Sequence, residues 1–134
     1  MWRREDVALA SEALVLLIAA RLAVWLLPFS RAHRLLRAWS RPRRADPPTA
    51  ERLGWAVAAA ARRLPSPFRA CLPQALAAEA LLRRHGAPAE LVIGVRQTGG
   101  ASAVQAHAWV LSGERVVVGW LDDLPSYVPL VPTT

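Results

Sequence analysis

Two residues of this chain, Cys71 and His107, are of the types that perform nucleophilic catalysis together. Cys71 is the only cysteine, so the chain cannot form an internal disulfide, and a lone thiol with histidines elsewhere in the sequence is typical of thiol enzymes. A cysteine thiol has a pKa of about 8.5 and is mostly protonated at neutral pH. A helix N-terminus or a neighbouring imidazolium favours the reactive thiolate. The chemistry indicated is attack of a thiolate on a carbonyl carbon.

The residues that follow Cys71 predict a helix that begins at the cysteine. Pro73 fits a helix only in the first turn, where its missing N–H costs nothing. The helix start also provides backbone N–H groups that have no partner within the helix and can hold an oxyanion. Gln74 is a further candidate oxyanion donor, although at N3 its side chain is more typical of a helix cap. The helix is expected over residues 71–85, with an apolar repeat followed by a closing Gly86: Leu72, Leu76, Ala80 and Leu81.

His107 is the best candidate for the general base among the three histidines. His33 lies in a basic N-terminal segment. His85 lies at the far end of the helix that Cys71 begins, about 21 Å from it at 1.5 Å per residue. His107 falls within a predicted strand, a rigid platform for an imidazole. Trp109 shares its face and could shield the site from water, although core packing is the more common reason for a tryptophan at such a position. On these spacings alone, a small buried cysteine and a structural histidine are the commoner explanation.

A third residue usually orients such a base through its other ring nitrogen. The candidates are Asp122 and Asp123, since Glu114 lies in a predicted turn. A two-residue turn within 112–114 would place even-numbered residues on the face of His107 and so favour Asp122. A longer turn with a bulge would favour Asp123 instead.

The body of the chain alternates between helix and strand patterns in an order that predicts an α+β domain. We expect a helix from Thr49, its cap, to about Leu64, then the Cys71 helix. Three antiparallel strands should follow, at 91–96, 105–111 and 115–120, and the tail from Pro125 should form an extended cover. The proline-rich stretch 41–48 predicts a division into an N-terminal helical segment, 1–48, and a core, 49–134.

Residues 13–29 are apolar apart from Arg21, and three interpretations fit them. The first is a secretory signal, but the segment is preceded by acidic residues and no cleavage site follows it. A membrane span would carry Arg21 near its middle. A helix buried against the domain or a partner is the third and favoured interpretation. Leu27-Pro28 should end this helix, and a basic helix should follow at 31–39.

Charge is unevenly distributed along the chain. Residues 1–70 contain thirteen arginines and five acids, whereas residues 71–134 contain four arginines and five acids. The basic half lacks the interleaved aromatics and the motifs of nucleic-acid-binding domains, so nucleic acid is not expected as a partner. One cysteine and three scattered histidines lack metal-ligand spacing. We therefore expect neither a metal nor another cofactor.

The segments CLPQALAA (71–78), LLRRHG (81–86), LVIGV (91–95) and AHAWV (106–110) occur in this order. Together they resemble the transglutaminase-like cysteine peptidases of lasso-peptide biosynthesis, in the stand-alone split form whose leader-binding function belongs to a separate protein. The N-terminal segment ending in LPF and the C-terminal LDDL are also similar, so the likeness spans nearly the whole chain.

This resemblance implies a papain-like and transglutaminase-like core, in which a helix with cysteine at its N-terminus packs on a small antiparallel sheet behind apolar N-terminal helices. Cys71 and His107 match the nucleophile and base. Some relatives place the acid where this chain has Gly119, so Asp122 or Asp123 must substitute, or a backbone carbonyl takes the role. The activity implied is removal of a leader peptide, without a cofactor.

The partners implied are the precursor peptide, a leader-binding recognition protein and a lasso cyclase, with a cytoplasmic location. Residues 13–29 could hold the chain at the inner face of the membrane. Two other functions fit the same residues. One is acyl transfer to an amine, as in true transglutaminases, and the other is a non-catalytic scaffold of the maturation complex.

Overall fold

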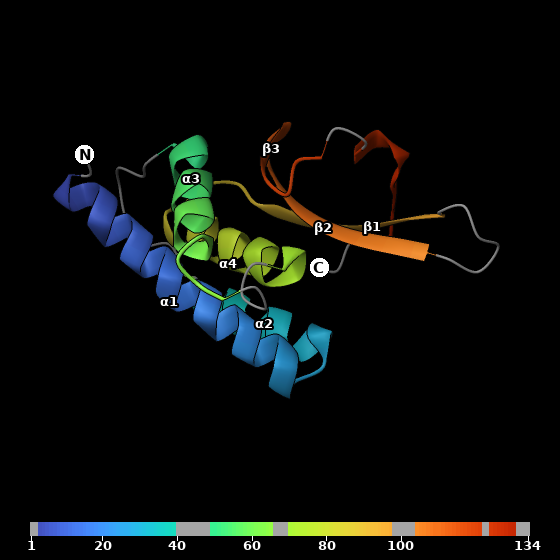
Figure 1. Ribbon diagram of the computed structural model, residues 1–134, viewed down its shortest axis with the longest axis horizontal. Coiled ribbons are helices and arrows are strands. Elements are labelled where there is room, and N and C mark those ends of the chain that lie inside the picture. Colours follow the sequence, from blue (N-terminus) through green and yellow to red (C-terminus); the bar gives the residue numbers. More distant parts are fainter. Residues whose placement is uncertain (1–2, 40–48, 66–69, 98–103, 122–123, 131–134) are drawn as a thin grey trace.

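A computed structural model of the chain describes residues 3–39, 49–65, 70–97, 104–121 and 124–130. Its architecture is α+β, with four helices on one face of a small antiparallel sheet (Figure 1). The elements run in the order α1 (Arg4–Leu26), α2 (Phe29–Trp39), α3 (Ala50–Ala61), α4 (Cys71–Arg84), β1 (Glu90–Gln97), β2 (Val104–Ser112), β3 (Arg115–Val118), the 3-10 helix η2 (Leu124–Ser126) and β4 (Val128–Pro129). The predicted fold class is confirmed.

The helices begin and end close to the predicted positions. The side chain of Thr49 accepts a hydrogen bond from the backbone N–H of Arg52, 3.2 Å away, and so caps α3 as expected. That helix ends at Ala61, three residues before the predicted Leu64. Leu27 is the C-cap of α1, because the residue before a proline is driven out of the helical conformation.

One hydrophobic core lies between the helices and the sheet. Residues of α1 recur in it with spacings of four and three, the pattern of a helix that buries one stripe. They pack with α3, α4 and the inner face of the sheet, so the N-terminal helices share one core with the rest of the chain. The largest fully buried side chains are Leu17, Leu53, Leu76, Leu81, Leu82, Val57 and Val110.

The sheet has the strand order β3-β2-β1-β4. The β1–β2 hairpin is regular and pairs Gly94 with His107. β4 pairs with the outer edge of β1, so part of the predicted cover is a fourth strand. The predicted loop at 41–48 and most of the loop after β1 lie outside the described residues.

The β2–β3 hairpin differs from the prediction in its register. Ser112 pairs with Arg115 across a two-residue turn, Gly113-Glu114, as one predicted alternative requires. A bulge between Val110 and Leu111 then shifts the pairing, so Val110 faces Val118. Val118 consequently packs in the core beneath the sheet. The prediction that even-numbered residues of this strand share the face of His107 therefore holds for Val116 but is wrong for Val118, past the bulge.

Candidate thiol site

Cys71 is the first residue of α4, whose N-cap is Ala70. Cys71 is a free cysteine, half-buried, and packs against the core cluster. The N–H groups of Cys71 and Leu72 have no partner within the helix because they lie in its first turn, and the first intrahelical bond is that from the N–H of Gln74 to the carbonyl of Ala70. A free thiol and two such N–H groups thus lie at the positive end of α4.

Gln74 occupies N4, one position later than expected, because the helix begins with Ala70 as its N-cap. Position N3 belongs to Pro73, whose side chain cannot reach back to the cap. The interpretation of Gln74 as an N3 capping residue is therefore wrong. Its assignment as an oxyanion donor stays a prediction.

His107 projects from the middle of β2 on the outer face of the sheet. Its ring stacks on Trp109, with centroids 6.0 Å apart, and lies 5.7 Å from the ring of Tyr127. Trp109 and Tyr127 belong to a small apolar cluster separate from the main core. The alternate residues Ala108 and Val110 face the helices instead.

The carbonyl oxygen of Gly119 lies 2.7 Å from Nε2 of the His107 ring. A carbonyl oxygen only accepts hydrogen bonds, so Nε2 carries the hydrogen and donates it. In the neutral ring the proton-accepting nitrogen is then Nδ1. A backbone carbonyl therefore orients His107 in the way that a triad acid would.

No hydrogen bond joins Cys71 to His107 among the residues that the structure describes. Cys71 lies on the helix side of the sheet, and the ring of His107 lies on the outer face with Trp109 and Tyr127. β3 pairs with β2 only at residues 110–112. Beyond these pairs Gly119 still lies against β2, close to Ala108 and to the ring of His107, and α4 packs beneath this strand (Figure 1).

The other two histidines are held by carboxylates of the helical layer. Nε2 of His33 lies 2.6 Å from Oε1 of Glu79 in a buried pair, and Nε2 of His85 lies 2.8 Å from Oε1 of Glu12. These contacts join α2 to α4 and α1 to α4. Both histidines therefore have structural partners, which agrees with their exclusion as the base.

The contacts of three further residues near His107 and Tyr127 were not predicted from the sequence, although Gly119 was noted as the position where some relatives have the acid. Arg96 donates to the side-chain oxygen of Gln105 from two nitrogens, at 2.9 and 2.7 Å, and its guanidinium lies 5.0 Å from the centre of the Tyr127 ring. Gly119 supplies the carbonyl on the ring of His107. The resemblance pointed to position 119 and left a backbone carbonyl open as the third member, whereas the aromatic type of Tyr127 does not by itself indicate a contact with His107.

Asp122 and Asp123 lie outside the described residues, so their relation to His107 stays a prediction. Their neighbour Leu121 packs against the outer-face cluster that contains Trp109. The chain therefore returns to the face of His107 just before the two aspartates.

The search with protein-family models matched residues 13–132 to the transglutaminase-like superfamily. The chain belongs to this superfamily. Neither curated proteins nor solved structures gave a match. Transglutaminase-like domains are usually cysteine peptidases or acyl transferases, so membership supports thiol chemistry at carbonyl carbon in general terms.

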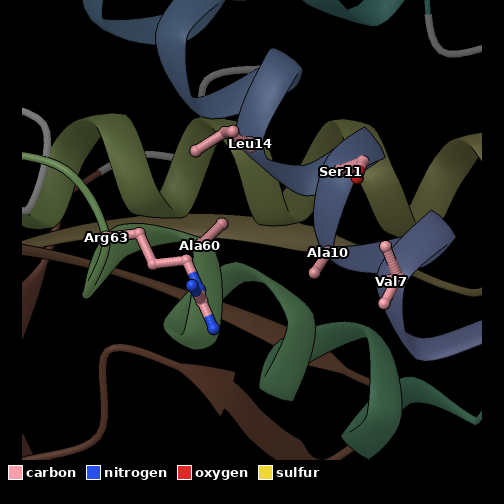
Figure 2. A pocket seen from close by; sticks show the side chains of 6 residues that line it. All are labelled: Val7, Ala10, Ser11, Leu14, Ala60 and Arg63. Carbon is pink, nitrogen blue, oxygen red and sulfur yellow. The ribbon is translucent and has the colours of Figure 1, made fainter. Parts of the chain in front are cut away.

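Two hollows on the surface of this transglutaminase-like domain lie away from Cys71. One, of about 570 Å³, lies on the outer face of the sheet and is lined by Trp109 with its neighbours Glu90, Leu91, Val92, Leu111, Pro129 and Leu130. The other, of about 320 Å³, lies between α1 and α3, where Val7, Ala10 and Leu14 approach Ala60 and Arg63 (Figure 2). Within the described ranges, no three acid, histidine or cysteine side chains cluster as metal ligands would.

Proposed function

We propose that this protein is a cysteine peptidase that removes the leader from a ribosomally made lasso-peptide precursor, with Cys71 as nucleophile. The observation that carries the proposal is the position of Cys71, a half-buried free cysteine at the N-terminus of α4 in a transglutaminase-like domain. The segments CLPQALAA and AHAWV, at the separation found here, support the narrower assignment to lasso-peptide maturation.

The reaction proceeds through an acyl-enzyme. Nδ1 of His107 takes the thiol proton, and the sulfur of Cys71 attacks the scissile carbonyl carbon. Backbone N–H groups at the start of α4 hold the oxyanion. The imidazolium then protonates the leaving amine, which departs as the core peptide. A water molecule, deprotonated by Nδ1, finally hydrolyses the thioester and releases the leader as a carboxylate.

Catalysis requires contact between two groups that the described structure does not join. Catalytic hydrogen bonds in free enzymes are often long and tighten only when substrate binds. The ring lies with the outer-face aromatics and the sulfur with the helical layer, so binding has to bring the ring towards the start of α4. We therefore propose that the bound precursor completes the pair.

A separate leader-binding protein and a cyclase complete the proposed system in the cytoplasm. A partner that holds the leader raises the effective concentration of the scissile bond at Cys71. The cyclase then uses the new N-terminal amine of the core peptide. Asp122, with Asp123 as substitute, is the proposed acid if a side chain rather than the Gly119 carbonyl orients His107.

The test is incubation of a precursor with this protein and its leader-binding partner, followed by mass spectrometry, for the unmodified chain and Cys71→Ala. Hydrolysis gives two peptides whose masses sum to the precursor plus one water. Transfer to an amine gives a crosslinked product, and a scaffold gives no change that depends on Cys71. Only the first result supports the proposal, and the other two contradict it.

A further inference from the structure

The helix α1 has a second apolar stripe that the core does not cover. The first stripe is buried, and Ala13, Leu17 and Ala20 within it are completely inaccessible. The second lies on the opposite side of the helix, and its side chains are largely exposed: Val15 at 65%, Leu22 at 43%, Trp25 at 70% and Leu26 at 68%. These four residues are called the outer stripe below.

Positive charge accompanies the outer stripe along the chain. Residues 13–39 contain four arginines and no acid. α2 begins only two residues after α1 ends, and Arg31 and Arg34 are exposed on it together with Leu35. The outer stripe is thus followed along the chain by two exposed arginines and an exposed leucine.

The acids of α1 all lie in its first half and two of them face the protein. Asp6 forms an ion pair with Arg52 of α3, and Glu12 with Arg84 of α4. In the described part of α1 and α2, the only carboxylate within one turn of the outer stripe is Glu12, which is already paired with Arg84 and His85. The surface suits an anionic occupant.

We infer that the outer stripe and the arginines of α2 bind the surface of an anionic lipid bilayer, with α1 lying flat in the headgroup region. Exposed tryptophan and leucine beside arginines are the composition of helices that lie in a membrane interface. Anionic lipid attracts each nearby arginine, and the apolar side chains enter the acyl boundary.

α1 is long and apolar enough to cross a membrane by length and composition alone. The structure favours the flat arrangement over a span, because one side of α1 is part of the domain core. A crossing would remove Leu17 and Ala20 from their contacts and place Glu12 in the membrane. The same helix can therefore be buried on one side and membrane-bound on the other.

Flotation of the full chain with vesicles tests this inference independently of any peptidase activity. We expect binding to vesicles of phosphatidylcholine mixed with phosphatidylglycerol, little binding to phosphatidylcholine alone, and release by high salt or alkaline carbonate. The variant with Leu22, Trp25 and Leu26 changed to serine should lose binding. Arg31→Glu with Arg34→Glu should weaken binding by at least about tenfold.

Matched controls are Val128→Ser, an exposed apolar residue of β4, and Arg62→Glu, an exposed arginine after α3. Both should bind as the unmodified chain does. Circular dichroism verifies folding, and the arginine variant decides the matter if the serine variant does not fold. Any of three results would overturn the inference: the unmodified chain fails to float with anionic vesicles, the serine and glutamate variants bind as well as the unmodified chain, or the bound chain resists carbonate extraction. A surface that binds only another protein gives the first of these results.

Discussion

Nε2 of His107 donates a hydrogen bond to the carbonyl oxygen of Gly119, 2.7 Å away, while Cys71 lies on the other side of the sheet without a hydrogen bond to the ring. The ring of His107 is therefore oriented independently of Cys71. This arrangement separates two properties that are usually coupled in thiol enzymes, the reactivity of the free thiol and the rate of turnover.

The first prediction concerns His107→Gln. Because the ring does not contact the sulfur in the free protein, alkylation of Cys71 by iodoacetamide should change by less than about twofold. Precursor cleavage should fall by about a hundredfold to ten-thousandfold, the usual contribution of a general base. Timed mass spectrometry measures both rates. A parallel fall of alkylation and cleavage would show that the pair is already joined in the free protein.

The second prediction concerns Gly119→Ala. Gly119 has φ of +92°, and a Cβ there would lie 2.7 Å from the carbonyl oxygen of Ala108 and 2.7 Å from Cβ of Trp109. We expect a loss of about 3 kcal/mol in the free energy of unfolding, from backbone strain and steric overlap. Cleavage should also fall by at least about tenfold in the folded fraction, because the carbonyl on His107 is displaced.

Gly113→Ala is the matched control for this substitution. Its φ of +65° is also in the left-handed region, but a Cβ there meets no atom within 4 Å. We expect only about 1 kcal/mol of destabilisation and unchanged cleavage. Urea unfolding compares the two variants. Equal destabilisation would mean that the close approach of Gly119 to β2 is unimportant.

The third prediction concerns the two aspartates. The Gly119 carbonyl already occupies Nε2 of His107, so we expect Asp122→Asn and Asp123→Asn to keep cleavage within about tenfold of the unmodified chain. Loss of a true triad aspartate lowers turnover by about ten-thousandfold. A loss of that size in one variant alone would identify that aspartate as the third member. Steady-state kinetics with the same precursor decides between them.

The register of the β2–β3 hairpin explains why the third residue could not be assigned from sequence. Val116, Val117 and Val118 are all apolar and β-branched, so they carry no alternation that would fix which of them faces the core. In the structure Val116 packs on the outer cluster, and Val117 and Val118 pack on the main core across the bulge. A single extra residue in the strand moves each later side chain to the opposite face of the sheet from the one predicted.

The helices were easier to predict because their ends carry specific chemical signals. Thr49 caps α3 and Pro73 fits only near the start of α4, so the position of Cys71 followed from local rules. The face on which His107 lies depends instead on contacts with Tyr127, twenty residues later in the chain. Such tertiary contacts leave no local pattern.

The last prediction concerns Glu12, which joins α1 to the C-terminal end of α4. Burial alone would raise its pKa, but hydrogen bonds and charge attraction from His85 and Arg84 outweigh burial and hold the pKa below the usual 4.5. The ionised carboxylate therefore stabilises the fold above about pH 4.5, and this contribution is lost as the pH falls through the lower native value. Glu12→Gln should cost about 1 to 3 kcal/mol at neutral pH and flatten the acid dependence of stability. Urea unfolding at a series of acidic pH values measures this.

The control is Glu114→Gln, at an exposed turn, which should change the free energy of unfolding by less than about 0.5 kcal/mol at any pH. If the Glu12 variant behaves in the same way, the contacts of Glu12 with Arg84 and His85 contribute nothing to stability.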